Sequence, residues 1–241
     1  MNNNQSVFDL FLIDIETVPQ VSSCEQLPEA NRKLFLDKIS KTMPDNFSEE
    51  EAYTKKAGIL AEFAKVICIS TGFFYKDKVG RICLKIKSIS HHDENQLLQQ
   101  FIELLTKMHK HNSNFQFAGH NIREFDMPFL CRRMIINSLP LPVSMNVAGA
   151  KPWEIKWVDT LQWWRFGDFK NYTSLHLLAT ILGIPTSKDD IDGSMVQHVY
   201  YQENDLPRIV RYCEKDVIVV ARVIQRMMSL PVIEDSNIII A

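Results

Sequence analysis

A short apolar run near the N-terminus ends in two carboxylates, and this arrangement limits how the chain can fold. The run from Phe11 to Glu16 is mostly large and apolar with two isoleucines, which predicts a buried strand. Side chains of a strand alternate between its faces, so Asp14 and Glu16 project from the same side. Two carboxylates there repel each other and lose hydration, which costs free energy unless a cation compensates. The pair indicates either a metal site or a strand end that reaches solvent, and the motif alone favours solvent.

A third carboxylate follows another strand-like run in the middle of the chain. Residues 115–118 are strand-like, a turn is expected at 119–121, and a helix is expected to start near Asp126, with Pro128 in its first turn. In that position Asp126 fits a helix N-cap, a role that needs no metal. Only if Asp126 faces the first strand does it join Asp14 and Glu16.

A long helical pattern near the C-terminus carries a tyrosine and an aspartate. Apolar residues recur at mainly helical spacing from about 205 to 228. Tyr212 and Asp216 are four residues apart and share a face of this helix. Taken alone, the pattern is that of a surface tyrosine beside a charged turn.

The three motifs together are more specific. Asp14-x-Glu16, Asn121-x-x-x-Phe125-Asp126 and Tyr212-x-x-x-Asp216 resemble the DEDD superfamily of 3′ to 5′ exonucleases. The tyrosine marks the tyrosine subtype, because the histidine subtype has a histidine where this chain has Arg211. Further segments are similar to a stand-alone bacterial branch related to the exonuclease domain of family B DNA polymerases: 158–160, 170–175, 188–194 and 212–216. The resemblance covers about residues 8 to 228.

The resemblance implies two divalent cations, Mg²⁺ or Mn²⁺, held by oxygen ligands. Asp14 would bridge both ions, Glu16 and Asp216 would complete the first site, and Asp126 would hold the second. Tyr212 would orient the attacking water rather than act as the main base, since a free phenol titrates near ~10. The implied substrate-binding residues are Thr17, Asn121, Phe125 and Lys170.

Order and composition predict one α/β domain over residues 1–241. Of these residues 46% are hydrophobic and 23% charged, which is the globular range. The resemblance implies a ribonuclease-H-like fold, and the patterns fit its mixed five-stranded sheet flanked by helices. Strands are expected near 8–15, 65–75, 81–90, 114–119 and 155–159, and helices near 93–110, 126–137, 173–182 and 205–228.

Two further segments are expected beside this sheet. Residues 20–62 read as a helical insertion between the first two strands, with a helix cap at Ser48. Residues 229–241 form a C-terminal tail whose isoleucines 238–240 fit a late strand, an interface or a disordered end. The acidic segment 188–193 lacks the first and last ligands of an EF-hand loop and is expected to be a solvated loop.

Composition also bears on location and partners. No apolar run has the length of a membrane span, and the polar start 1–5 lacks the regions of a signal peptide, so a soluble, cytoplasmic protein with no membrane partner is expected. The five cysteines are widely spaced, which suggests neither a disulfide framework nor a zinc site. A homo-oligomer is left open.

The net charge of −2 lacks the basic footprint of a strong nucleic-acid binder, so weak, salt-sensitive binding through a few local cations is expected. The candidate cations are Arg132, Arg133, Arg165, Lys170, Arg208 and Arg211. Aromatic side chains cluster between Trp153 and Tyr172. Most are expected in the core, and exposed ones near Lys170 are candidates for stacking on bases.

The sequence thus predicts a metal-dependent exonuclease acting on single-stranded nucleic acid with a free 3′ end, with DNA favoured. An exoribonuclease on the same scaffold is the nearest alternative, because these motifs do not discriminate a 2′-hydroxyl. A catalytically silent nucleic-acid-binding module is the alternative of another class. The complete set of carboxylates argues against silence, because uncompensated acids in one pocket have little structural use.

Overall fold

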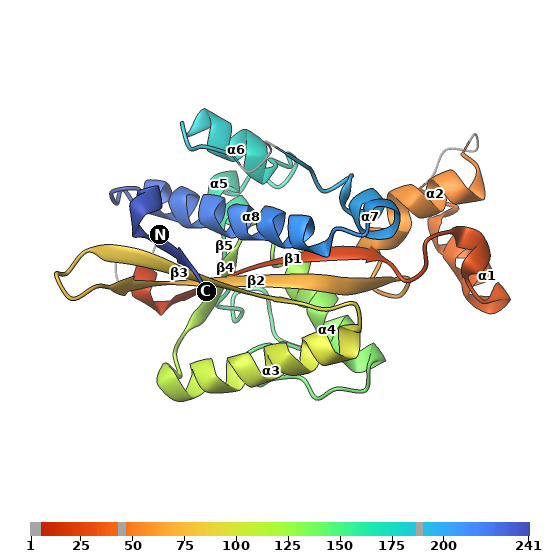
Figure 1. Ribbon diagram of the computed structural model, residues 1–241, viewed down its shortest axis with the longest axis horizontal. Coiled ribbons are helices and arrows are strands. Elements are labelled where there is room, and N and C mark those ends of the chain that lie inside the picture. Colours follow the sequence, from red (N-terminus) through yellow and green to blue (C-terminus); the bar gives the residue numbers. More distant parts are fainter. Residues whose placement is uncertain (1–5, 43–46, 187–189) are drawn as a thin grey trace.

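The computed structural model describes residues 6–42, 47–186 and 190–241. Its centre is a mixed sheet with helices on both faces (Figure 1). The strands are β1 (Leu10–Pro19), β2 (Ala64–Lys76), β3 (Ile82–Ser90), β4 (Gln116–Gly119), β5 (Val158–Asp159) and β6 (Ile238–Ile240). They lie in the order β5-β4-β1-β2-β3-β6.

The five predicted strands are present, and the C-terminal tail adds a sixth. β1, β2 and β3 form an antiparallel meander, whereas β4 pairs in parallel with β1, and β5 in parallel with β4. In the tail, β6 pairs in parallel with Leu84–Ile86 of β3. The late strand is therefore the correct one of the three alternatives for isoleucines 238–240.

Eight α-helices lie within the described ranges. They are α1 (Glu29–Ile39), α2 (Glu49–Lys56), α3 (Glu94–His111), α4 (Asp126–Ile136), α5 (Thr160–Arg165), α6 (Leu175–Ile181), α7 (Val196–His198) and α8 (Leu206–Met227). A 3₁₀ turn, η3 (Ala57–Ile59), follows α2, and a π-helical turn, η4 (Val199–Glu203), follows α7. The four predicted helices correspond to α3, α4, α6 and α8.

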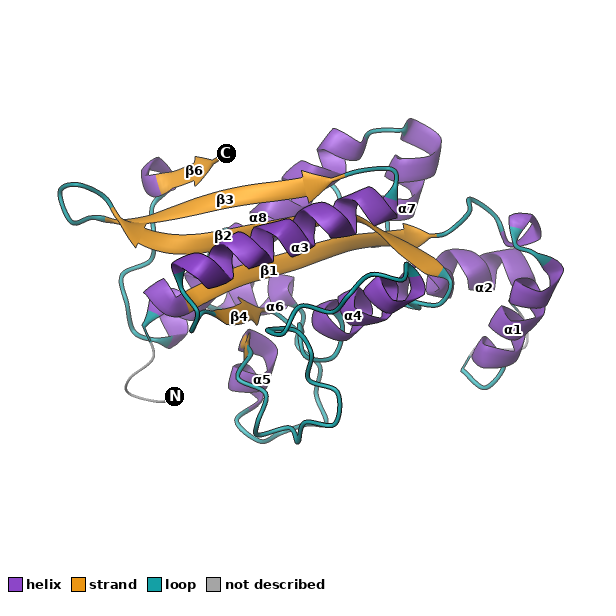
Figure 2. Ribbon diagram, turned by 90° about the horizontal axis from the view of Figure 1, so that it is seen from below, coloured by secondary structure: helices purple, strands orange, loops and turns teal. Residues whose placement is uncertain are grey.

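Alternation along β1 divides the core into two layers. Leu10 and Leu12 pack against α8 on one face of the sheet, whereas Phe11 and Ile13 pack on the face that α3 and α4 cover (Figures 1 and 2). α8 suits this position because its apolar residues recur along one side and are buried. Side chains at even-numbered positions of β1 therefore point towards α8.

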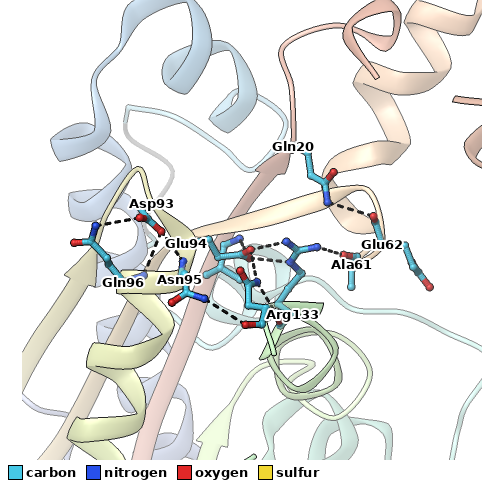
Figure 3. Close-up of polar contacts among 10 residues, drawn as sticks. Gln20, Ala61, Glu62, Asp93, Glu94, Asn95, Gln96 and Arg133 are labelled. Carbon is cyan, nitrogen blue, oxygen red and sulfur yellow. Dashed lines mark hydrogen bonds and ion pairs between the residues drawn. The ribbon is translucent and has the colours of Figure 1, made fainter. Parts of the chain in front are cut away.

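A buried ion pair joins the two helices on the opposite face (Figure 3). Arg133 Nε of α4 donates to Glu94 Oε1 of α3 at 2.8 Å, and Arg133 Nη1 donates to Ala61 O at 2.8 Å. Glu94 Oε1 also accepts from Val66 N of β2 at 2.8 Å. Arg133 is only 4% exposed, so its prediction as a candidate phosphate-binding cation is wrong. Its charge is neutralised within the protein.

The insertion between β1 and β2 lies beyond one end of the sheet (Figures 1 and 2). Phe35 of α1 and Tyr53 of α2 pack in a small buried cluster of their own. Ser48 caps α2 in the predicted way, since its hydroxyl accepts from Glu51 N and the Glu51 carboxylate accepts from Ser48 N. The segment 188–193 falls partly on residues 187–189, which lie outside the described residues.

Within the described residues, no helix is both long enough and apolar enough to cross a lipid bilayer.

Candidate active site

The two carboxylates of β1 point towards α8, where the alternation of the strand places them. Asp14 and Glu16 continue the series begun by Leu10 and Leu12. Along β1 this series changes from apolar to acidic. The facing side of α8 has apolar Val217 and Val220 over the two leucines, whereas its Cys213 contacts Asp14. Glu16 is 8% exposed, so the predicted alternative of a strand end open to solvent does not hold for it.

The thiol of Cys213 lies directly at this carboxylate pair. Cys213 Sγ is 3.2 Å from Asp14 Oδ2 and 3.5 Å from Asp14 O, to both of which it donates. One ligand atom each from Asp14, Glu16 and Cys213 lie within 4.8 Å of one another. This spacing, found among the described residues, suits a bound metal ion.

Asp126 faces the first strand rather than capping its own helix. It is the first residue of α4, and the N-cap residue is Phe125, which makes no side-chain cap bond. Asp126 Oδ1 instead accepts from Ile15 N of β1 at 3.2 Å. This backbone group needs a side-chain partner because β4 pairs with β1 only as far as Leu12. The N-cap prediction is therefore wrong, and Asp126 lies beside Asp14 and Glu16.

The turn after β4 brings Asp126 to this position. A Cβ atom on Gly119 would come within 2.8 Å of Ile13 O, so only glycine allows the turn to pass so close to β1. Asn121 follows in a left-handed conformation, with φ of 63°. The buried carboxylate of Asp159, at the end of β5, accepts from Asn121 N at 2.9 Å and from Arg123 N at 3.0 Å.

Asp159 also caps α5 by accepting from Leu161 N and Gln162 N. It thus fixes the turn that carries Asp126 and starts a helix at the same time. Asp159 belongs to the segment 158–160 that resembles the family, but no role was predicted for it from the sequence. Its place at the end of a strand and the start of a helix was the available signal.

Burial and mutual repulsion raise the pKa values of the carboxylates. Burial raises the pKa of Asp14 well above its usual range, and the charges of Asp216 and Asp126 raise it further. Burial likewise raises the pKa of Glu16, with the charges of Asp14 and Asp216 adding to it. Burial raises the pKa of Asp126 to about 7. The charge of Asp216 raises the pKa of all three of these carboxyls, which means that the four acidic side chains share one poorly solvated region.

Tyr212 and Asp216 reach this region from α8. Burial raises the pKa of the Tyr212 phenol far above its usual value, and the charges of Asp216, Glu16 and Asp14 add to the effect. The phenol therefore stays protonated at neutral pH and can donate a hydrogen bond. It is unsuited to accept a proton from water.

The four predicted substrate-binding residues occupy different places. Thr17 donates through Oγ1 to Gly58 O at 2.7 Å and lines a cavity beside the carboxylates, as does Phe125. Asn121 Oδ1 is buried and accepts no hydrogen bond from the described residues. Lys170 is exposed on the loop between α5 and α6.

The loop that carries Lys170 is rich in exposed aromatic side chains. Phe166, Phe169 and Tyr172 are 84%, 70% and 62% exposed. Burial of its hydroxyl end and the charges of Asp126 and Asp159 raise the pKa of Tyr172. The loop therefore passes close to the carboxylates.

Two of the other candidate cations are engaged in ion pairs. Arg165 pairs with Glu124, and Arg208 pairs with Asp190 and Glu203. Arg132 and Arg211 are exposed.

A family model matches the larger part of the chain. Residues 59–231 match the model of a family described as a predicted 3′-5′ exonuclease related to the exonuclease domain of PolB. The matched range contains Asp126, Tyr212 and Asp216, whereas Asp14 and Glu16 precede it. A search of curated proteins found no match.

Among solved structures, the chain is similar to the family B DNA polymerase from the hyperthermophilic archaeon Pyrobaculum calidifontis, with a TM-score of 0.52 and 15% sequence identity. The match covers 91% of this chain and 24% of that chain, so this chain spans about a quarter of the polymerase. At this identity the likeness shows the fold alone. It confirms the ribonuclease-H-like α/β fold that the sequence predicted.

Proposed function

Because the chain belongs to the family of predicted 3′-5′ exonucleases related to the exonuclease domain of family B DNA polymerases, we propose that it is a metal-dependent exonuclease. It removes nucleotides from the 3′ end of single-stranded nucleic acid, and DNA is the favoured polymer. The observation that carries the proposal is that Asp14, Glu16, Asp126 and Asp216 come from three separate elements, yet the charges of the others raise the pKa of each carboxylate for which a shift is resolved.

The residues present fit a pair of hard divalent cations. Carboxylate oxygens are the ligands that Mg²⁺ and Mn²⁺ prefer. Here they are buried together, and no cation of the protein is among the groups that shift the pKa of Asp14 or Glu16. Asp14, Glu16 and Asp216 would hold one cation, and Asp14 and Asp126 the other. Two such cations supply positive charge that stabilises both the attacking and the leaving oxygen of an in-line phosphodiester displacement.

The protein's own groups then position the reactants. A hydrogen bond with Asp216 holds the protonated phenol of Tyr212 beside the carboxylates, where it would orient the attacking water. Cys213 donates to Asp14 Oδ2 and so limits how that carboxylate can rotate. Asn121 Oδ1 accepts no hydrogen bond from the described residues, and it would be available as an acceptor if the substrate displaced the groups that bury it.

The path of the strand away from the site follows from the exposed aromatic loop. Phe166 and Phe169 present flat apolar faces to solvent, and Lys170 lies beside them with its positive charge. Aromatic side chains stack on bases without reading sequence, while a cation contacts the backbone phosphate. This combination suits a single strand and explains how a chain of net charge −2 binds a polyanion.

The test uses matched 5′-labelled single-stranded DNA and RNA, incubated with Mg²⁺, Mn²⁺ or a chelator. We expect a metal-dependent ladder that shortens from the 3′ end, and the polymer cleaved faster identifies the sugar preference. An Asp14→Ala protein should be inactive, whereas Asp37→Ala, at an exposed position of α1, should match the wild type. A fully active Asp14→Ala protein, or no cleavage of either polymer by folded wild type, contradicts the proposal.

A further inference from the structure

A cavity of about 450 Å³ lies between β1 and the insertion. Glu16 and Thr17 line it from β1, and Phe125 lines it from the start of α4. The insertion contributes Lys55 of α2 and Ile59 of η3 to the lining. Ligand cavities for small molecules measure roughly 300 to 1,000 Å³, so the space suits one nucleoside and no longer piece of a strand.

The cavity is continuous with the carboxylate cluster because Glu16 belongs to both. A phosphodiester bound at the carboxylates has two substituents, and the cavity beside Glu16 offers space for one of them. The other has the exposed aromatic loop available, since that loop also approaches Asp126. Water attack at phosphorus breaks the bond to the 3′ oxygen of the penultimate nucleotide, which takes a proton, and the phosphate stays on the released terminal nucleoside. The small enclosed space therefore fits the terminal nucleoside.

The wall formed by the insertion is held against β1. Thr17 Oγ1 donates to Gly58 O at 2.7 Å, and Gln20 N donates to Phe63 O at 2.9 Å. Two hydrogen bonds therefore join residues 58–63 to the end of β1 and the residue after it. A Cβ on Gly58 would already be 3.4 Å from the Pro19 ring. This close approach obstructs any strand that would continue past the carboxylates.

The lining suits a nucleoside chemically. Ile59 and Phe125 both contribute apolar surface to the lining, against which a flat base can pack. Lys55 is a cation of the lining. Its Nζ lies 4.0 Å from the centre of the Phe47 ring, and this cation–π contact within the insertion holds the ammonium group in place. A nearby cation stabilises the phosphate that stays with the nucleoside.

We propose that this cavity binds the terminal nucleoside, and that Lys55 and Ile59 of the insertion determine how it is seated and restrict hydrolysis to strand ends. The assignment rests on the proposed exonuclease function. Residues 20–58 precede the range that matches the family, so Lys55 lies outside that match and Ile59 at its first residue. The insertion is therefore part of the substrate site rather than a peripheral addition.

The test measures binding of deoxyadenosine 5′-monophosphate by titration calorimetry in Mn²⁺, and hydrolysis of a single-stranded oligonucleotide. Ile59→Trp fills the cavity and Lys55→Glu reverses its charge, and both residues are exposed, so the fold should tolerate both changes. We expect each variant to bind the nucleotide at least tenfold more weakly and to raise KM for the oligonucleotide. Leu34→Trp, at an exposed position of α1 that does not line the cavity, is the matched control.

The results separate the two proposals. Wild-type binding of the nucleotide by both variants, or no binding by the wild type, overturns the cavity assignment even if the oligonucleotide is hydrolysed. Failure of the folded wild type to hydrolyse any oligonucleotide, with any of the metals, overturns the exonuclease function itself.

Discussion

The thiol of Cys213 donates to the carboxylate of Asp14 across the contact between α8 and β1, over 3.2 Å. Tyr212, the neighbour of this cysteine, shares a helix face with Asp216. The same turn of α8 therefore supplies a positioning contact to the first strand and two of the predicted catalytic residues. Displacement of α8 along β1 would disturb all three together.

Removing the thiol should weaken the metal site. Cys213→Ala deletes a donor to Asp14 Oδ2, and loss of such a group near a metal ligand lowers affinity or activity by about 10- to 100-fold. Because a thiol is a weak donor, we expect the lower end of that range, and Cys213→Ser should recover most of the loss. Mn²⁺ titration followed by electron paramagnetic resonance measures the affinity directly. Cys131→Ala is the control, and equal affinity in Cys213→Ala and wild type would refute the role.

Neutralising Asp126 should stabilise the metal-free protein at neutral and higher pH. Its folded pKa is about 7, above the ordinary value of 3.8, so the folded state retains a proton that the unfolded state releases. The contribution of this group to the free energy of unfolding is therefore complete below about pH 4. It falls as the pH rises towards about 7 and is lost above that. We expect Asp126→Asn to raise the free energy of unfolding at pH 8 by a few kcal/mol, and to change it little at pH 4.

Denaturant unfolding in chelator at several pH values measures this effect. The exposed Asp37→Asn change is the control, and Mg²⁺ should stabilise the wild type more than the Asp126 variant because it binds the folded site. A pH profile of Asp126→Asn that runs parallel to the wild type would show that the carboxylate is not protonated in the folded protein.

Replacing the Tyr212 phenol should slow hydrolysis without stopping it. Tyr212→Phe keeps the ring and its packing but removes the donor, which the raised pKa keeps protonated. We expect kcat to fall by about 10²-fold, as for the loss of a positioning contact, with KM little changed. Single-turnover hydrolysis at saturating Mg²⁺ gives kcat for the chemical step. A loss as complete as that of Asp14→Ala would instead assign the phenol an essential role.

The buried ion pair should matter for stability and not for substrate binding. Arg133→Met leaves Glu94 buried without its cation, which should cost about 3 to 5 kcal/mol. The matched change Arg32→Met breaks the exposed pair with Glu49 and should change the free energy of unfolding much less, because solvent screens that pair. Urea unfolding compares the two. Unfolding at the same urea concentration would contradict the structural role of Arg133.

The exposed aromatic loop should contribute to binding in proportion to strand length. Phe166→Ala and Phe169→Ala should each weaken binding of a single-stranded 12-mer by roughly 1 to 3 kcal/mol through lost stacking. A mononucleotide, which would occupy the cavity beside Glu16 alone, should bind as before. Fluorescence anisotropy in Ca²⁺ compares the two ligands, with Phe8→Ala as the control. Equal losses for both lengths would place the effect elsewhere.

Local sequence patterns were sufficient for most of the fold. The helix of α8 and the strand of β1 follow from periodicity, because burial of one face imposes the spacing of apolar residues. The Ser48 cap follows from residue type and spacing alone. The fate of the tail did not follow, because pairing of β6 depends on whether the edge of β3 is available.

The candidate site was predictable only in part. Order and spacing selected Asp14, Glu16, Asp126, Tyr212 and Asp216, but the role of Asp126 as a helix cap or as a neighbour of β1 depends on where β4 ends. An arginine such as Arg133 is usually found at the surface, yet Glu94, 39 residues earlier, binds it inside the protein. Cys213 gave no local signal because its partner Asp14 is distant in sequence, and the local cap position of Asp159 did not reveal its contact with the turn at Asn121.

The sequence by itself determined which side chains share a face, since the periods of helix and strand are local properties of the backbone. It thereby determined that Asp14 shares a face of its strand with Glu16, and that Tyr212 shares a face of its helix with Asp216. Only the tertiary structure decided which faces meet, because sheet order and helix packing depend on contacts between distant segments, such as Asp14 and Cys213, which are 199 residues apart. The same packing decided that the insertion lies against β1 and encloses a cavity beside Glu16.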